Sequence, residues 1–119
     1  MNKCDISLYA IIDPERTRGR PLGDLVKSAA DGGITLLQYR DKLSDTRSLI
    51  SNAEIIKNAL SSYSIPLLIN DRVDVALAVE AEGVHVGQSD MAPADARRLL
   101  GADALIGLTI KSLENARAA

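Results

Sequence analysis

The stretches 36–42 (LLQYRDK) and 66–72 (PLLINDR) decide the fold that this 119-residue chain is expected to adopt. Each is a short apolar run that ends abruptly in charged and amide side chains. A parallel strand that is buried on both faces reads as a near-continuous hydrophobic stretch. In parallel barrels of alternating strands and helices, the polar residues just after each strand form the active site. The two stretches therefore predict strands whose ends carry a functional site.

Strand and helix patterns alternate along the whole chain. We expect strands over residues 7–13, 34–38, 65–69, 83–87 and 104–110, and helices over 22–31, 44–60, 72–81, 94–100 and from 112 onward. A charged stretch with a glycine, residues 15–21, is expected to be a loop. Such alternation means a parallel sheet with right-handed crossovers. About five strands cannot close an eight-stranded barrel. The prediction is an α/β fold of TIM-barrel type, truncated to about five strands, in a single partial barrel domain over residues 1–119.

Composition and charge narrow the class of partner. The chain is 46% hydrophobic and 25% charged with a formal net charge of −2, so its bulk charge does not favour nucleic acid or anionic membranes. It has no Phe or Trp, so no aromatic platform for single-stranded nucleic acid is expected. No apolar run approaches the roughly 20 residues of a membrane span. The lone cysteine, Cys4, allows no intramolecular disulfide and fits a reducing cytosol, so a cytoplasmic location is expected.

Basic residues alternate at the end of the first decisive stretch. Gln38, Arg40 and Lys42 occupy every second position, and a period of two sends such residues to one face of an extended chain. The side chains of all three are therefore expected to face the same site at the strand ends, while Tyr39 and Asp41 face away from it. Guanidinium and ammonium groups suit a polyphosphate. The alternative is a solvated charged loop with ion pairs between near neighbours in the sequence.

Two carboxylates follow the later predicted strands. Asp71, which comes after Asn70, and Asp90 are hard oxygen ligands of the kind that Mg²⁺ prefers, usually with one or two protein carboxylates and substrate phosphates. Either aspartate could instead cap the helix that follows it. His85 lies inside an apolar strand pattern, where a hydrogen-bonded core histidine and a catalytic one are both open. Gln88, just past that strand, is a candidate contact to a heteroaromatic substrate.

Four linked segments resemble thiamine-phosphate synthase: residues 38–42 (QYRDK), 69–74 (INDRVD), 83–90 (GVHVGQSD) and 106–109 (IGLT). The match runs from the first predicted strand to the last residue, in the family's order and spacing. The resemblance implies a compact TIM barrel that joins 4-amino-2-methyl-5-(diphosphooxymethyl)pyrimidine to a thiazole phosphate. The implied products are thiamine monophosphate and pyrophosphate. The implied partners are these small molecules, and the implied cofactor is Mg²⁺.

The resemblance also implies roles for individual residues. Arg40 and Lys42 are the expected catalytic groups, because they would neutralise the charge that builds on the departing pyrophosphate. The expected substrate-binding residues are Gln38, Tyr39, Arg40, Asp41, Lys42, Asn70 and Thr109. Asp71 and Asp90 are the expected Mg²⁺ ligands. Thr109 stands where the family often has serine, a change that keeps the hydroxyl.

The family has roughly three more strands after the point where this sequence stops, and those strands carry the grip on the thiazole phosphate. A truncated gene product, a fragment and a half-barrel that dimerises are all open, and the chain alone is expected to be a poor catalyst. One alternative is the related thiazole tautomerase or regulatory branch, which would not need both carboxylates. Another is a non-catalytic half-barrel that binds phosphate ligands or self-associates through its open sheet edge.

Overall fold

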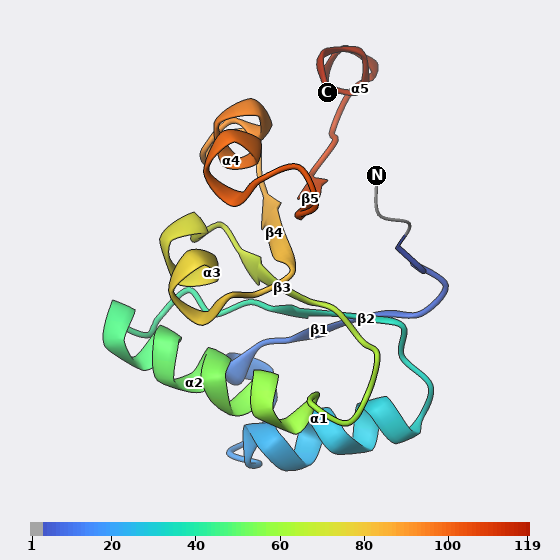
Figure 1. Cartoon of the computed structure of the whole chain (residues 1–119), viewed down its shortest axis with the longest axis vertical. Coiled ribbons are helices and arrows are strands. Elements are labelled where there is room, and N and C mark those ends of the chain that lie inside the picture. The colour runs from blue at the N-terminus through green and yellow to red at the C-terminus, as the bar shows by residue number, and fades with distance from the viewer. Residues whose placement is uncertain (1–3) are drawn as a thin grey trace.

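The computed structural model describes residues 4–119, which form a parallel sheet with helices along one side (Figure 1). The strands are β1 (Tyr9–Ile12), β2 (Leu36–Tyr39), β3 (Leu67–Asn70), β4 (Gly83–Val86) and β5 (Leu105–Leu108). The helices are the 3-10 helix η1 (Pro14–Arg16), α1 (Leu22–Asp31), α2 (Thr46–Ala59), α3 (Val73–Val79), α4 (Pro93–Leu100) and α5 (Leu113–Ala118). Neighbouring strands are all parallel, in the order β1-β2-β3-β4-β5. The predicted α/β repeat is therefore present, as an open portion of a parallel barrel.

The hydrophobic core lies between the sheet and the helices. Alternate strand residues face the helices and are buried: Leu37, Tyr39, Leu67, Ile69, Val84 and Val86. The helices meet them with residues at helical spacing: Val26, Leu49, Ala53, Ile56, Val73 and Val79. Because the strand period is two, the remaining strand side chains point to the other face of the sheet. That other face carries Gln38 and His85 alongside apolar residues such as Leu36 and Leu68.

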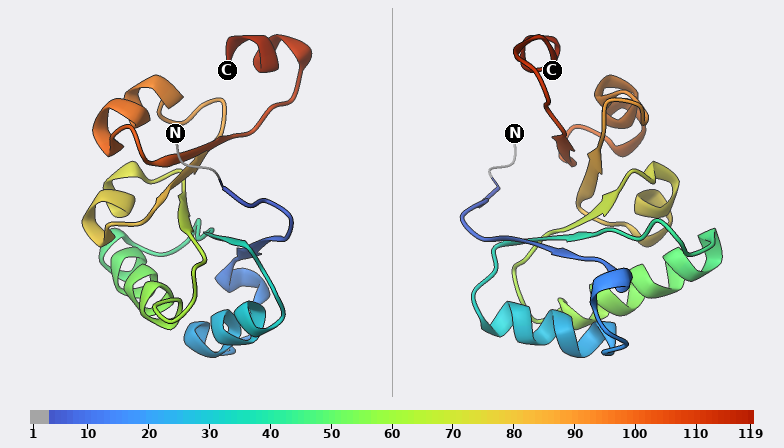
Figure 2. Two further views of the ribbon diagram at one scale, coloured as in Figure 1. Left: turned by 45° about the vertical axis from the view of Figure 1, so that its right-hand side comes forward. Right: turned by 180° about the vertical axis from the view of Figure 1, so that it is seen from behind.

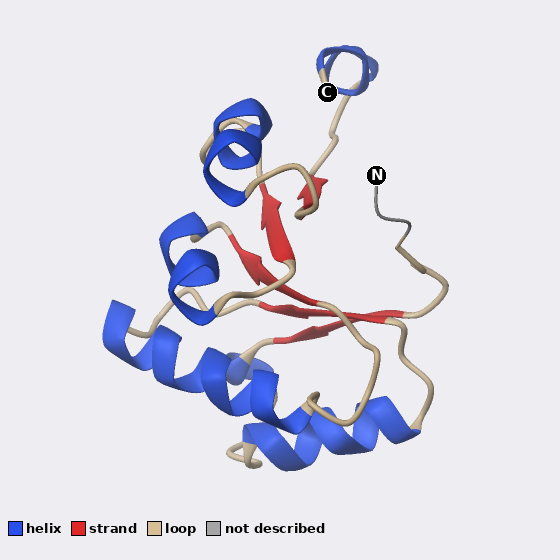
Figure 3. Cartoon of the chain, in the orientation of Figure 1, coloured by secondary structure: helices blue, strands red, loops and turns tan. Residues whose placement is uncertain are grey.

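The second face of the sheet carries no helix in the described part of the chain (Figures 2 and 3). On β1 the side chain of Ile11 is 56% exposed, and Ile6 and Leu8 just before the strand are also exposed. Helix α5 buries no residue and lies at the end of an extended segment, apart from the other helices (Figure 1). Among residues 4–119, no helix has the length and apolar character needed to cross a membrane.

Local chemistry shifts several predicted boundaries. The predicted loop over 15–21 contains part of η1, because Asp13 Oδ1 accepts the Glu15 N–H at 3.0 Å and caps the turn. Helix α2 begins at Thr46 rather than at residue 44, since Asp45 is its N-cap. The helix predicted over 72–81 ends two residues early, because Glu80 adopts a left-handed φ of 55°. Strands β2 and β3 each run one residue beyond their predicted ends.

Candidate functional site

Polar side chains from four strand ends meet in one pocket at the carboxyl edge of the sheet. The pocket has a volume of about 600 Å³. Three of its lining residues are basic, namely Arg40, Lys42 and Lys111, and two are carboxylates, Asp71 and Asp90. Neutral polar groups complete the lining: Asn70, Gln88, Ser89 and Thr109. Each of these residues follows β2, β3, β4 or β5 closely, so the parallel arrangement of the strands is what brings them together.

Arg40 and Lys42 are each held by a carboxylate from another strand end. Arg40 Nη1 donates to Asp13 Oδ2 at 2.7 Å, where the Asp13 side chain is 6% exposed and that of Arg40 39%. The Lys42 ammonium group forms an ion pair with Asp71 Oδ2. The charged-loop alternative expected ion pairs between near neighbours in the sequence. Within residues 4–119, no such ion pair involves Arg40 or Lys42. Both cations are therefore anchored across the sheet at the pocket.

Gln38 lies on the same face as Arg40 but does not line the pocket. Its side chain is 3% exposed, and Nε2 donates to the hydroxyl of Tyr9 on β1 at 2.9 Å. Of the three side chains predicted to face the same pocket, those of Arg40 and Lys42 reach it, whereas Gln38, two residues before Arg40, is buried. Burial also raises the pKa of Tyr9.

Tyr39 and Asp41 face away from the pocket, as the alternation predicts. Tyr39 packs in the core, and its hydroxyl donates to Asp41 Oδ2 at 2.8 Å. Burial, together with this bond to a carboxylate, raises the pKa of Tyr39. Burial alone would raise the pKa of Asp41, but hydrogen bonds from Ser44, Tyr39 and the Leu43 N–H hold it below its usual value. Both residues therefore shape the loop after β2 and make no contact with the pocket lining.

Neither Asp71 nor Asp90 is a helix cap, since α3 and α4 both begin without a side-chain capping bond. Asp71 has a φ of 64°, a left-handed conformation that is uncommon outside glycine. Such backbone geometry costs on the order of 1–3 kcal/mol and concentrates at functional sites. Asp90 Oδ2 accepts the Gly87 N–H at 2.7 Å, which folds the loop after β4 back over the strand end. Both carboxylates are thereby kept in the pocket.

The two carboxylates suit a divalent metal that is completed by its substrate. Mg²⁺ takes oxygen ligands and is usually bound by one or two carboxylates plus substrate phosphates. Asp71 and Asp90 line one pocket together with the amide of Asn70 and the hydroxyl of Ser89. In the described part of the chain, no three acidic, His or Cys side chains cluster closely enough to hold a metal by themselves. The donor set therefore fits Mg²⁺ when waters or a ligand such as a diphosphate supply the remaining oxygens.

His85 and Thr109 share a hydrogen bond on the open face of the sheet. His85 Nε2 lies 3.0 Å from Thr109 Oγ1. A Cβ atom on Gly107, opposite His85 in β5, would clash with His85 Nδ1, so the glycine makes room for the ring. Burial lowers the pKa of His85, so the imidazole is neutral at pH 7. His85 is hydrogen-bonded, as one of the two open interpretations had it, but it is partly exposed and fixes the Thr109 hydroxyl beside the pocket.

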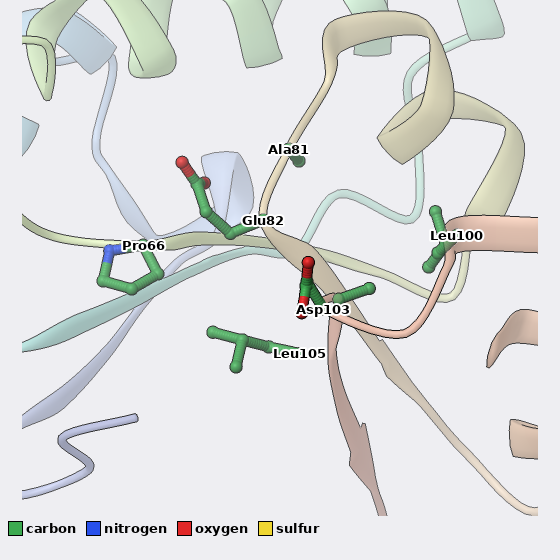
Figure 4. Close-up of a pocket in the computed structure, with 7 residues that line it drawn as sticks. Pro66, Ala81, Glu82, Leu100, Asp103 and Leu105 are labelled. Atoms are coloured by element: carbon green, nitrogen blue, oxygen red, sulfur yellow. The ribbon is translucent and has the colours of Figure 1, made fainter. Parts of the chain in front are cut away.

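A second pocket, of about 480 Å³, lies at the opposite, amino end of the strands (Figure 4). Pro66, Glu82 and Leu105 stand at the starts of three neighbouring strands and line it. Glu82 Oε2 accepts the Leu67 N–H at 2.8 Å, so this carboxylate secures the start of β3. In barrels of this type, the amino end of the strands serves stability and the carboxyl end serves chemistry. The first pocket, at the carboxyl end of the strands, is therefore the candidate functional site.

Sequence reasoning missed two pocket residues and one residue behind the pocket. Lys111 follows Thr109 by two positions, the same spacing that marks Arg40 and Lys42, and this signal could have found it. Ser89 carried no pattern of its own. Asp13 contacts Arg40 across 27 residues of sequence, a pairing that only the fold reveals.

The fold and the pocket together define a class of protein: a parallel α/β barrel portion with cationic and anionic side chains converging at its carboxyl edge. A family model described as thiamine monophosphate synthase matches residues 8–119. The chain belongs to the thiamine monophosphate synthase family. This confirms the resemblance found in the four sequence segments.

Individual relatives agree with the family match. Thiamine-phosphate synthase from Agrobacterium fabrum is 50% identical over 119 residues, which are 100% of this chain and 54% of the relative. The enzyme of the same name from Persephonella marina is 40% identical over 115 residues, 97% of this chain and 55% of the relative. The structure of a thiamine phosphate pyrophosphorylase from Pyrococcus furiosus superposes with a TM-score of 0.82 at 34% identity, covering 95% of this chain and 54% of that one. The chain thus spans about half the length of these relatives, and its TIM-barrel-like fold is confirmed.

Proposed function

We propose that this chain forms the diphosphate- and metal-binding half of a thiamine-phosphate synthase site. The reaction would join 4-amino-2-methyl-5-(diphosphooxymethyl)pyrimidine to a thiazole phosphate, giving thiamine monophosphate and pyrophosphate. One observation carries the proposal: three basic side chains and two carboxylates line a single pocket at the strand ends. Membership of the family supports it. The half of the relatives that this chain does not span would supply the thiazole-phosphate site.

The basic side chains account for the leaving group. As the C–O bond of the pyrimidine methylene breaks, its electron pair goes to the pyrophosphate oxygen. Arg40, Lys42 and Lys111 converge where that charge would develop, and prepositioned cations of this kind stabilise a transition state strongly. The thiazole nitrogen then donates its lone pair to the methylene carbon and forms the C–N bond. No covalent enzyme intermediate is needed, so orienting the two substrates does the remaining work.

Mg²⁺ is the cofactor that we propose, with Asp71 and Asp90 as its protein ligands. When bound, it would supply positive charge against the diphosphate. Asn70, between the basic and acidic groups, can donate its amide N–H to a phosphate oxygen. Gln38 and Thr109 lie on the face that the pyrimidine would approach, and both are already held by partners on neighbouring strands. The two carboxylates favour the synthase over the tautomerase or regulatory alternative.

The titration of the chain with the pyrimidine diphosphate, with and without Mg²⁺, tests this proposal. Calorimetry is expected to show Mg²⁺-dependent binding. Arg40→Gln should weaken binding about tenfold or more, because a hydrogen bond to a charged group is lost. Arg98→Gln is the matched control, since Arg98 forms an exposed ion pair with Asp95 on α4. Equal affinity of Arg40→Gln and the unmodified chain would refute the proposed site.

We also propose that a second copy of this chain pairs with its open sheet edges. Within residues 4–119, the outer strands β1 and β5 each have a neighbour on one side only. Natural edge strands are protected by lysine, proline or bulges, and neither YAII of β1 nor LIGL of β5 contains a charge or a proline. The exposed side chains of Ile6, Leu8 and Ile11 add apolar surface beside the β1 edge.

We also propose a cytoplasmic location for the chain. Its single cysteine, Cys4, allows no intramolecular disulfide, which fits a reducing compartment.

A further inference from the structure

Strand β1 contributes no residue to the pocket lining, yet it holds two residues of the neighbouring strand end. Within residues 4–119, the buried polar or charged side chains are Asp13 and Gln38. Both take part in a bond between β1 and the β2 segment: Asp13 accepts from Arg40, and Gln38 donates to Tyr9. Buried polar groups are retained only with partners, because an unpaired one is costly. The role of these two bonds therefore lies in how they hold the β2 segment.

Asp13 is the better connected of the two, since both of its carboxylate oxygens are used. Oδ1 accepts the Glu15 N–H at 3.0 Å, and Oδ2 accepts Arg40 Nη1 at 2.7 Å. The Arg40 main chain is fastened to the same strand, because its N–H donates to the Ile12 carbonyl at 2.8 Å. Arg40 is thus fixed to β1 at both its backbone and its guanidinium group. Asp13 engages Nη1, which leaves Nε and Nη2 as donors for a ligand.

We propose that Asp13 is a positioning residue that holds the Arg40 guanidinium group in the orientation needed to bind a diphosphate. This inference rests on the role proposed above for Arg40. An arginine side chain has large rotamer freedom, and fixing it before the ligand arrives removes that entropic cost from binding. Asp13 itself lies behind Arg40, is almost fully buried and is absent from the pocket lining. Asp13 would therefore act on a ligand in this pocket through Arg40, and it also borders a separate pocket with Ile11, Arg16 and Arg40.

Removing the Asp13 charge separates positioning from simple electrostatics, because the two effects have opposite signs. A carboxylate near a phosphate site repels an anion, so on charge alone Asp13→Asn would tighten pyrophosphate binding. If Asp13 positions Arg40, the same change frees the guanidinium group and weakens binding. Asparagine keeps an oxygen that can accept the Glu15 N–H, so the cap of η1 is retained. The variant therefore changes little besides the contact with Arg40.

Calorimetric titration of the 119-residue chain with magnesium pyrophosphate is the first test. Asp13→Asn is expected to weaken binding about tenfold, as for loss of a charge-assisted contact. Asp95→Asn is the matched control, because it also removes a carboxylate paired with an arginine, Arg98, but on α4 outside the pocket. Both variants are compared at a temperature where circular dichroism shows them folded, so that a loss of stability alone does not register as weaker binding. Equal or tighter binding by Asp13→Asn overturns the inference.

A second readout needs no ligand and so separates this inference from the proposed function. The side-chain ¹⁵N signals of Arg40 report rotation of the guanidinium group. In the unmodified chain, separate Nη signals are expected, because the bond to Asp13 hinders rotation. In Asp13→Asn they should merge, and in Asp95→Asn they should stay separate. Merged Arg40 Nη signals in the unmodified chain would overturn the positioning role of Asp13. If the Nη signals are separate but pyrophosphate does not bind, only the role proposed for the pocket is overturned.

Discussion

Two basic side chains of the pocket are each paired with a carboxylate from another strand end. Asp13 with Arg40 and Asp71 with Lys42 are the two examples. Each pairing keeps a cation in the pocket while the ligand is absent. A pocket of this kind has little reorganisation to undergo when an anion enters, which is the advantage of preorganised electrostatics. Asp71 in the pocket, and His85, which hydrogen-bonds the pocket residue Thr109, lead to specific predictions.

Asp71→Asn should abolish the Mg²⁺ dependence of pyrophosphate binding. The change removes a charged oxygen ligand but keeps a residue type that tolerates the left-handed φ of 64°. The partially exposed ion pair with Lys42 is lost, which costs at most about 1 kcal/mol of folding free energy. Calorimetry with and without Mg²⁺ measures the first effect, and urea unfolding measures the second. Asp74→Asn, which removes an exposed ion pair with Arg72, is the control. Full Mg²⁺ dependence in Asp71→Asn would rule out this ligand.

His85 should make the folded chain less stable as the pH falls below about 6.5. Burial lowers its pKa in the folded state from the ordinary value of 6.5, so between these two values the unfolded chain binds more protons. The free energy of unfolding therefore rises with pH through this window and falls on acidification. His85 is the one histidine in the sequence, and aspartates begin to contribute only below about pH 5. Urea unfolding between pH 7.5 and 5.5 tests this.

His85→Gln is the control for that pH series. Glutamine keeps a group that can hydrogen-bond Thr109 but does not titrate, so its unfolding free energy should be flat over the same range. An equal pH slope in the variant and the unmodified chain would show that another group is responsible.

The types of residue in the pocket could be predicted from sequence, but their pairing could not. Period two correctly separated Arg40 and Lys42 from Tyr39 and Asp41. The ion pair of Lys42 with Asp71 spans 29 residues. Its geometry depends on how adjacent strands are aligned, which no local pattern specifies. Gln38 shows the same limit, because its burial depends on Tyr9 from another strand.

Among the elements, β4 and β5 approach each other more closely than side chains would allow. Gly83 pairs with Leu105, and a Cβ atom on Gly83 would overlap the Leu105 main chain. Backbone atoms cannot rotate out of the way as a flexible side chain can. The glycine is therefore required by strand pairing rather than by its own φ angle.

Gly83→Ala should destabilise the chain by at least about 2 kcal/mol, because overpacking here must push two strands apart. Thermal and urea unfolding measure the change. Gly23→Ala is the control, since its new Cβ would meet only Ile55 Cγ2 at an ordinary 3.8 Å, on a helix where alanine is favoured by up to about 1 kcal/mol. Similar unfolding free energies for Gly83→Ala and the unmodified chain would contradict the close approach.

The order and type of the elements followed from hydrophobic periodicity, while their ends followed from single side chains. Alternating apolar runs correctly placed five strands and the helices between them. The start of α2 moved because Asp45 caps it, and η1 formed because Asp13 turned its carboxylate onto a backbone N–H. Capping bonds are worth about 1 kcal/mol each, enough to shift a boundary but not to change the fold.

At the scale of the whole molecule, the sheet is covered on one face and open on the other, with two free edges. We expect the chain to self-associate in light scattering coupled to size exclusion. Ile11→Lys should reduce this association, because an edge lysine blocks strand pairing. Leu77→Lys is the control, since Leu77 is also exposed, at 46%, but lies on helix α3. A monomer at all concentrations for the unmodified chain would contradict the proposal.

The fit of His85 over Gly107 restricts how this chain could diverge from its relatives. A Cβ atom at position 107 would overlap the ring of His85, so the restriction falls on position 107 as long as His85 keeps its present orientation. A larger residue at 107 requires the His85 ring to move or a smaller residue to replace it, and either change would break the hydrogen bond between His85 and Thr109. We therefore expect glycine at position 107 wherever a family member has histidine at position 85 in this hydrogen bond, whereas position 85 can change while position 107 stays glycine.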